Sequence, residues 1–109
     1  MRRGIAWFSA LVLTACSGSS STATLYRNSP LGTATRVHWA TFDAKESDPS
    51  YNMNNCLMAA RLLNANMTAS AVQVGRTRSP GVGFWCEPGS FRENGSIPTT
   101  FPEAYPTDT

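Results

Sequence analysis

Residues 49–65 read PSYNMNNCLMAARLLNA, and they carry the clearest secondary-structure signal in the chain. Apolar residues recur at spacings of three and four, which places them on one face of an amphipathic helix. They are Met53, Cys56, Leu57, Ala60, Leu63 and Met67. Asp48 can cap the helix, and Pro49 suits its first position because its missing N–H would be unpaired there. The stretch predicts a helix at about 49–65.

The polar residues of this stretch are expected outside the apolar face. The residues predicted to lie on the other faces are Asn52, Asn54, Asn55 and Arg61. Asn64 and Asn66 are predicted to end the helix as C-terminal caps, because asparagine tolerates the left-handed backbone conformation.

The segment before the helix, residues 36–44, is predicted to be a strand. Alternation places Val37, Trp39 and Thr41 on one face. It places His38, Ala40 and Phe42 on the other. Large apolar groups on both faces indicate a central strand that is covered on both sides or by a helix and a tail.

Further strands are predicted on both sides of this unit. Residues 69–74 contain Val72 and Val74 and form a short strand candidate, and a Gly/Pro-rich loop follows at 75–83. Residues 84–87 (FWCE) are predicted to form a strand that stops at Pro88-Gly89. Upstream, Leu25 and Tyr26 are interpreted as a short edge strand or, preferentially, as apolar residues that dock on the domain.

The predicted fold class is α+β, with one amphipathic helix packed on a small sheet of about three strands. A strand–helix–strand crossover would make the outer strands parallel if they were neighbours. The predicted organisation has a signal peptide at 1–15, a lipidated cysteine and flexible tether at 16–34, a domain at 35–91 and a disordered Pro-rich tail at 92–109.

The N-terminus resembles a bacterial lipoprotein signal peptide. Met1-Arg2-Arg3 is a positive segment, and the mostly apolar residues 4–13 are too few to span a bilayer, which takes about 20 residues in a helix. Leu13-Thr14-Ala15-Cys16 then resembles a lipobox, which implies that Leu13, Thr14 and Ala15 are read by the signal peptidase and that Cys16 is lipidated. The alternative is an ordinary cleaved signal peptide in which Cys16 is incidental.

This predicted signal peptide determines the expected net charge and the expected cellular location of the mature protein. The chain has nine Lys and Arg against seven Asp and Glu; without Arg2 and Arg3 seven of each remain. A balanced charge gives no electrostatic case for a nucleic-acid partner. Ser17 rather than Asp after Cys16 favours an outer-membrane anchor facing the periplasm, with the inner membrane as the alternative. The expected partners are this membrane and an envelope protein, and the oligomeric state is left open.

The two other cysteines, Cys56 and Cys86, are expected to form a disulfide between helix and sheet, because the predicted compartment is oxidising. Two free buried thiols and a redox-active pair are the alternatives, and the second is disfavoured by the absence of a CxxC motif.

The sequence indicates no catalytic or metal site, and the protein is predicted to be a non-enzyme without cofactors. His38, the one histidine, has no partner at a motif spacing, which favours a structural role. Asp43, Glu46 and Asp48 could hold calcium, but their spacing is not that of an EF-hand loop, so a solvated loop is preferred. Arg76 and Arg78 could bind an anion, with solvated side chains as the alternative.

The chain also resembles a group of small uncharacterised lipoproteins of proteobacteria and their phages. The resemblance lies in LYRNS at 25–29, RVHWATFDA at 36–44, the Tyr51-Asn52 and Asn55-Cys56 pairs, and FWCEPG at 84–89. It implies a disulfide-stapled lipoprotein of phage or mobile-element origin and transfers no activity.

Two functions follow as hypotheses. The first is a non-catalytic lipoprotein that contacts an envelope partner, for example by blocking a phage receptor and so excluding superinfection. The second is a lysis-associated, spanin-like outer-membrane lipoprotein. It is motivated by Pro98, Pro102 and Pro106, which recur with Phe101 and Tyr105 between them. This tail is interpreted as a dangling terminus or, less readily, as a partner-binding strip.

Overall fold

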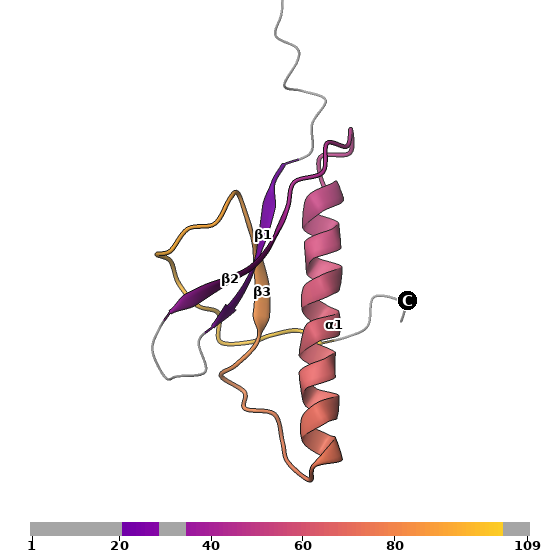
Figure 1. Cartoon of the computed structure of the whole chain (residues 1–109), viewed down its shortest axis with the longest axis vertical. Coiled ribbons are helices and arrows are strands. Elements are labelled where there is room, and N and C mark those ends of the chain that lie inside the picture. The colour runs from indigo at the N-terminus through magenta and orange to yellow at the C-terminus, as the bar shows by residue number, and fades with distance from the viewer. Residues whose placement is uncertain (1–20, 29–34, 104–109) are drawn as a thin grey trace, which may run out of the picture.

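One helix packs on a three-stranded antiparallel sheet in the computed structural model, which describes residues 21–28 and 35–103 (Figure 1). The elements are β1 (Ala23–Asn28), β2 (Arg36–Phe42), α1 (Tyr51–Gln73) and β3 (Phe84–Pro88). Their order in the sheet is β2-β1-β3. The predicted α+β class is confirmed. Within the described ranges, no helix is long and apolar enough to cross a membrane.

The central strand is β1, which pairs antiparallel with both neighbours. Leu25 is 2% exposed and Tyr26 is fully buried, so consecutive side chains are covered on opposite faces of the sheet. The prediction of a tether over 16–34 is therefore wrong for residues 23–28, and the prediction of β2 as the central strand is also wrong. β2 and β3 run in the same direction but are separated by β1, so they do not pair.

The bulge in β2 lies at Trp39. Leu25 pairs with Ala40 and Tyr26 with His38, which leaves Trp39 as an extra residue. An extra residue reverses which face the following side chains occupy. Ala40 packs on the helix side of the sheet, whereas the His38 ring stacks on Phe91. The prediction that His38, Ala40 and Phe42 share one face is wrong for this reason.

Both faces of the sheet are covered. The helix side holds the buried residues Ala23, Leu25, Cys56, Ala60 and Phe84. The other side holds Tyr26, Trp85 and Phe101, with Ile97 packed against them. The chain after β3 supplies this second layer: it loops away from the sheet and returns toward α1 (Figure 1).

The C-terminal segment is thus part of the packed unit as far as it is described. Phe101 is 5% exposed, and its ring centre lies 6.1 Å from that of Trp85. Gly83 allows this approach, because a Cβ there would overlap the Phe101 side chain. The prediction of a disordered tail is wrong for residues 92–103, and residues 104–109 lie outside the described part. The packed unit extends beyond the predicted limits of 35–91 at both ends.

The helix is longer than predicted: it ends at Gln73, and Gly75 stops it. The Gly75 N–H donates to the Val72 carbonyl at 3.0 Å, and the Arg76 N–H donates to the Ala71 carbonyl at 2.8 Å. These are the two hydrogen bonds of a Schellman motif, which needs a left-handed residue after the helix, and Gly75 has φ of 73°. The predicted strand at 69–74 is wrong, because no helix breaker precedes Gly75 after Pro49.

The helix starts slightly later than predicted. Its N-cap is Ser50, so Pro49 lies before the helix rather than at its first position. The Asp48 carboxylate accepts hydrogen bonds from the Ser50 N–H at 2.9 Å and from the Ser50 hydroxyl at 2.8 Å. Asp48 therefore supports the turn that precedes the helix instead of capping it.

Gly75→Ala is expected to lower the free energy of unfolding by about 1–2 kcal/mol, because a Cβ is unfavourable in the left-handed conformation. No atom lies within 4 Å of the position that this Cβ would occupy, so the effect isolates backbone strain. Chemical denaturation measures it, and Gly81→Ala, which also has open space, is the control. Equal stabilities of the two variants would contradict the assignment of Gly75 as the helix stop.

Candidate interaction surface

The buried side of α1 carries a line of small and polar residues. Asn52, Cys56, Ala60 and Asn64 follow each other at intervals of four, and all are buried. Both asparagines were predicted elsewhere, Asn52 on another face and Asn64 as a cap, and both predictions are wrong. The four-residue interval they share with Cys56 and Ala60 is the sequence signal that could have placed them.

Each buried asparagine satisfies both backbone groups of one residue outside the helix. The Asn64 amide accepts from the Phe84 N–H at 2.8 Å and donates to the Phe84 carbonyl at 3.1 Å and the Pro102 carbonyl at 2.9 Å. Asn52 accepts from the Ala44 N–H and donates to the Ala44 carbonyl, both at 3.0 Å. Asn64 therefore holds α1 against β3, and Asn52 holds it against the chain just after β2, about three turns away.

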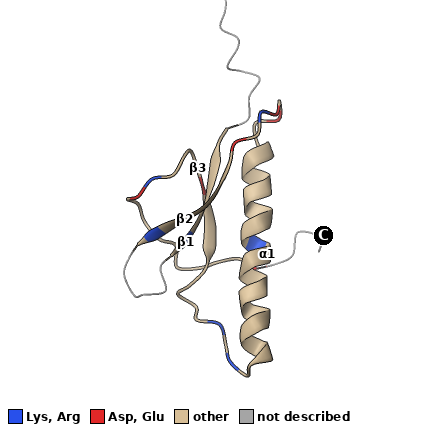
Figure 2. Cartoon of the chain, viewed as in Figure 1, with Lys and Arg blue, Asp and Glu red and all other residues tan. Residues whose placement is uncertain are grey.

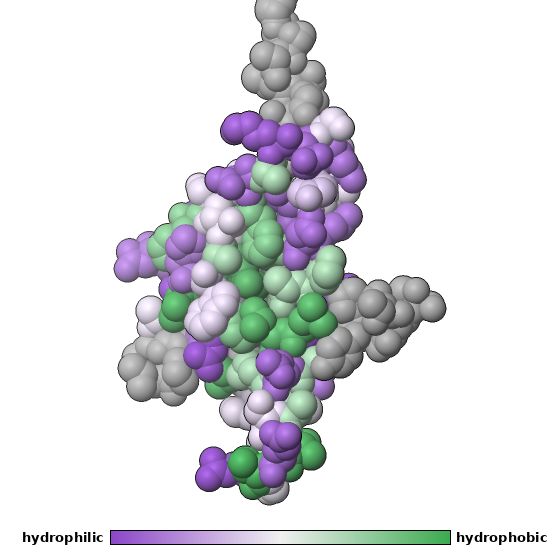
Figure 3. Space-filling view, turned by 45° about the vertical axis from the view of Figure 1, so that its right-hand side comes forward, coloured by the Kyte–Doolittle hydropathy of each residue, from purple (hydrophilic) through white to green (hydrophobic). Residues whose placement is uncertain are grey.

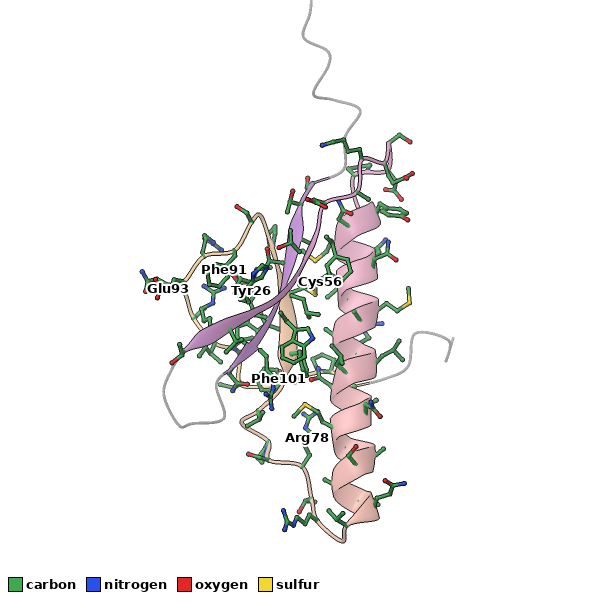
Figure 4. The ribbon with its side chains drawn as sticks, in the orientation of Figure 1. Tyr26, Cys56, Arg78, Phe91, Glu93 and Phe101 are labelled. Carbon is green, nitrogen blue, oxygen red and sulfur yellow. A yellow bond between two sulfur atoms is a disulfide. The ribbon has the colours of Figure 1, made fainter. Side chains whose placement is uncertain are left out.

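The disulfide between Cys56 and Cys86 fixes the middle of this contact, and its prediction is confirmed (Figure 4). Their Cα atoms are 6.1 Å apart. Cys56 is fully buried and belongs to the helix-side core.

The opposite face of the sheet contains an arginine held by one carboxylate and several aromatic rings. The Arg36 guanidinium forms an ion pair with Glu87, lies 4.2 Å from the Tyr26 ring centre and donates to the Asn94 carbonyl at 2.6 Å. Burial raises the pKa of the Glu87 carboxyl, but hydrogen bonds from Trp85 and Arg36 and the positive charges nearby outweigh it and lower the pKa overall. This cluster holds the segment after β3 against the sheet, so its charged groups serve the fold.

Between α1 and the start of β3 the surface is apolar and hollowed. Figure 3 shows hydrophobic side chains gathered between sheet and helix. A hollow of about 320 Å³ opens there, lined by Leu63, Asn66, Met67, Ser70 and Phe84. We call this hollow the α1–β3 groove.

Exposed side chains of the sheet border the groove. Trp39 is 50% exposed, and its ring meets the Phe84 ring edge-on with centres 5.0 Å apart. Val37 is 37% exposed, and the Arg27 guanidinium lies 5.7 Å from the Phe84 ring centre. Aromatic, methionine and arginine side chains are the types enriched at protein–protein interfaces. The groove can therefore accept an apolar side chain of a partner.

A second hollow, of about 360 Å³, lies where α1 begins. It is lined by Phe42, Asp43, Ala44, Tyr51, Asn52 and Asn55. Asn52 and Ala44 are already bonded to each other, so much of the polar lining serves the fold.

The charged candidates from the sequence are mostly engaged within the fold. Figure 2 shows charged residues in the loops and on the strands. In α1 the one charged residue is Arg61. Arg78 donates to the Asn64 carbonyl at 3.1 Å and pairs with Glu103 at 3.3 Å, so it supports the helix rather than an anion site. Arg76 is exposed. The Asp48 side chain is held by Ser50, whose hydrogen bonds lower the pKa of the carboxyl.

His38 lies apart from these groups: its Nε2 is 2.7 Å from the Thr41 hydroxyl, and its ring stacks on Phe91. Within residues 21–28 and 35–103, no three His, Cys, Asp or Glu side chains lie close enough to hold a metal ion. Leu13, Thr14, Ala15 and Cys16 lie outside the described residues, so their roles stay predictions.

Comparison with known protein families, with curated proteins and with solved structures finds no match to this chain. The resemblance to phage and proteobacterial lipoproteins therefore stays a hypothesis.

Proposed function

We propose that the protein is a lipid-anchored envelope lipoprotein that binds an envelope protein through the α1–β3 groove. The observation that carries this proposal is Trp39, a half-exposed tryptophan beside an open apolar hollow. A tryptophan that leaves much of its area in water is a candidate binding hot spot, because its burial by a partner is strongly favourable. The role is non-catalytic.

The proposed lipid anchor determines where the domain would meet its partner. Residues 17–22 separate Cys16 from β1, and six residues span at most about 20 Å. The domain would therefore stay close to the membrane surface, facing the periplasm if the anchor is in the outer membrane. Acyl chains contribute about 0.8 kcal/mol per buried CH₂, so more than one chain makes such anchoring stable.

Labelling with radioactive palmitate tests the anchor. The wild-type chain is expected to incorporate label, and Cys16→Ser is expected to incorporate none, because the thiol that receives the lipid is missing. An unlabelled wild type would remove the lipid anchor from the proposal, whatever the groove does.

Phage adsorption tests the receptor-blocking version of the contact. Expression of the wild type is expected to reduce adsorption of at least one phage in a panel, and Trp39→Ala is expected to restore adsorption without unfolding the domain. Val74→Ala, which removes a side chain 67% exposed beyond the end of α1, is the matched control and is expected to behave as wild type. Unchanged adsorption across the panel would reject receptor blocking.

The lysis-associated alternative was motivated by an unengaged Pro-rich tail. Phe101 is buried and the Pro102 carbonyl is bonded to Asn64, so this part of the tail has a role within the fold. The described residues thus add no observation that favours the alternative.

A further inference from the structure

The outward side of α1 carries a second regular pattern, distinct from the one that packs on the sheet. Its residues alternate at spacings of four and three over the whole helix: Tyr51, Asn55, Met58, Leu62, Ala65, Ala69 and Val72. We call this set the outer seam. A sustained alternation of this kind is the a/d pattern of a coiled coil, and one asparagine among apolar residues is a common way to fix its register.

The structure places most of the seam in water. Tyr51 is 40% exposed, Met58 42%, Leu62 39% and Val72 64%. Met53, Ala60 and Met67 lie on the opposite side of the helix and pack toward the sheet. The helix therefore has two apolar sides, and the domain itself uses one.

The remaining composition of α1 agrees with a second packing partner. Arg61 is the one charged residue among its 23 residues. A helix side that remains in water normally carries charged residues. In a parallel pair in register, the position of Arg61 faces that of Asn66 in the other copy, so no like charges oppose each other.

We infer that the outer seam binds the outer seam of a second copy of this chain, in a parallel pair. The parallel direction rests on the proposed lipid anchor. A 23-residue helix is about 35 Å long, whereas residues 17–22 reach at most about 20 Å. In an antiparallel pair that stands upright on the membrane the two N-termini would lie at opposite ends, and both tethers could not reach that membrane.

The size of the seam sets the conditions under which the pair forms. A strip about 35 Å long and about 10 Å wide covers on the order of 350 Å², less than the about 800 Å² per partner of a standard stable complex. The pair is therefore weak in dilute solution. Anchoring both copies in one membrane raises their effective concentration and favours the pair.

Residues 104–109 of the same chain are the competing occupant. They follow Glu103, whose carboxylate accepts a hydrogen bond from the Thr68 hydroxyl at 2.9 Å. Ala65 is the seam residue that is already covered, at 7% exposed. The experiment must therefore separate a second copy from this segment.

Cysteine cross-linking of the full-length protein in bacterial membranes tests the inference. Val72→Cys is expected to give a disulfide-linked dimer, because position 72 faces itself in a parallel pair and lies about 30 Å from itself in an antiparallel one. Val74→Cys, at a position that is 67% exposed just beyond α1 and outside both the seam and the groove, is the matched control. The dimer fraction of Val72→Cys is expected to exceed that of the control by about tenfold.

A seam-breaking variant completes the test. Adding Met58→Glu and Leu62→Glu to Val72→Cys is expected to abolish the dimer and leave the melting temperature unchanged, because both side chains are exposed. A monomeric Val72→Cys, or equal cross-linking of the control, would overturn the inference. A Val72→Cys dimer that appears only after deletion of residues 104–109 would assign the seam to that segment instead.

Palmitate labelling of the same variants separates this inference from the anchor. A labelled protein that does not cross-link rejects the pair and leaves the anchor intact. An unlabelled protein that cross-links supports the pair and rejects the anchor.

Discussion

Replacing Cys56 and Cys86 together with alanine is expected to lower the free energy of unfolding by about 3–4 kcal/mol. The disulfide joins residues 30 positions apart, and closing a loop of that length restricts the unfolded chain by about this amount in the chain-entropy model. Domains are stable by about 5–15 kcal/mol, and small ones lie near the lower limit. The variant is therefore expected to be partly unfolded at physiological temperature.

Urea denaturation in a Cys16→Ser background measures this effect, because that background removes both the proposed lipid and the third thiol. The Cys16→Ser protein with its disulfide intact is the control, and the same protein after reduction should match the double variant. A double variant within about 0.5 kcal/mol of the control would contradict a stabilising role, since surface substitutions produce changes of that size.

The helix was predictable because its sequence pattern depends on neighbouring residues, and the disulfide was predictable because of the chemistry of cysteine. The periodicity of Met53, Cys56, Ala60 and Leu63 depends on neighbouring residues, and the pairing of Cys56 with Cys86 follows from the number of cysteines and the expected compartment. The end of the helix was readable as well: Gly75 is the first glycine after Pro49, but asparagines at 64 and 66 suggested an earlier stop.

The sheet was harder to predict because its arrangement depends on contacts between distant segments. β1 has no alternating pattern, since its residues are buried on both faces, and nothing local marks a short segment as a central strand. The bulge at Trp39 changes the sheet face on which the following side chains lie, and no glycine or proline in β2 marks its position in the sequence. The burial of Phe101 depends on Gly83, which is 18 positions away in the sequence.

The candidate surface was missed for a related reason. Trp39 and Met67 were each assigned to apolar faces, and both assignments imply burial. The sheet leaves Trp39 at an edge, where its ring meets Phe84, and α1 continues past the predicted end at residue 65. Phe84 and the second half of α1 form the groove. An exposed tryptophan cannot be distinguished from a core tryptophan until the strand order is known.

Asn64→Ala is expected to lower the free energy of unfolding by about 3–5 kcal/mol, as much as loss of the disulfide. The substitution removes three hydrogen bonds and leaves the buried N–H and carbonyl of Phe84 without the amide that pairs them. An unsatisfied buried polar group costs about 1–3 kcal/mol, and up to three groups are affected. β3 is an edge strand, so its outer side has no further strand to replace these bonds.

Asn66→Ala is the matched control, because both asparagines were predicted to be helix caps, whereas the structure buries Asn64 and leaves Asn66 exposed. Its effect is expected to stay within about 0.5 kcal/mol. Urea denaturation of both variants gives the comparison, and amide hydrogen exchange at Phe84 should accelerate in Asn64→Ala alone. Equal effects of the two substitutions would show that Asn64 does not tie α1 to β3.

Asn64→Asp tests whether hydrogen bonding, rather than packing, accounts for this role, because aspartate has nearly the same shape as asparagine. Its carboxylate can still accept from the Phe84 N–H but would face the carbonyls of Phe84 and Pro102 without a proton to donate. Burial and these carbonyls should raise the pKa of the new carboxyl above its unfolded value, against the opposing effect of the Arg78 guanidinium at the Asn64 carbonyl. The variant should therefore gain stability as the pH falls from about 8 to about 5, when the carboxyl regains a donor proton. Packing alone predicts the stability of wild type at every pH.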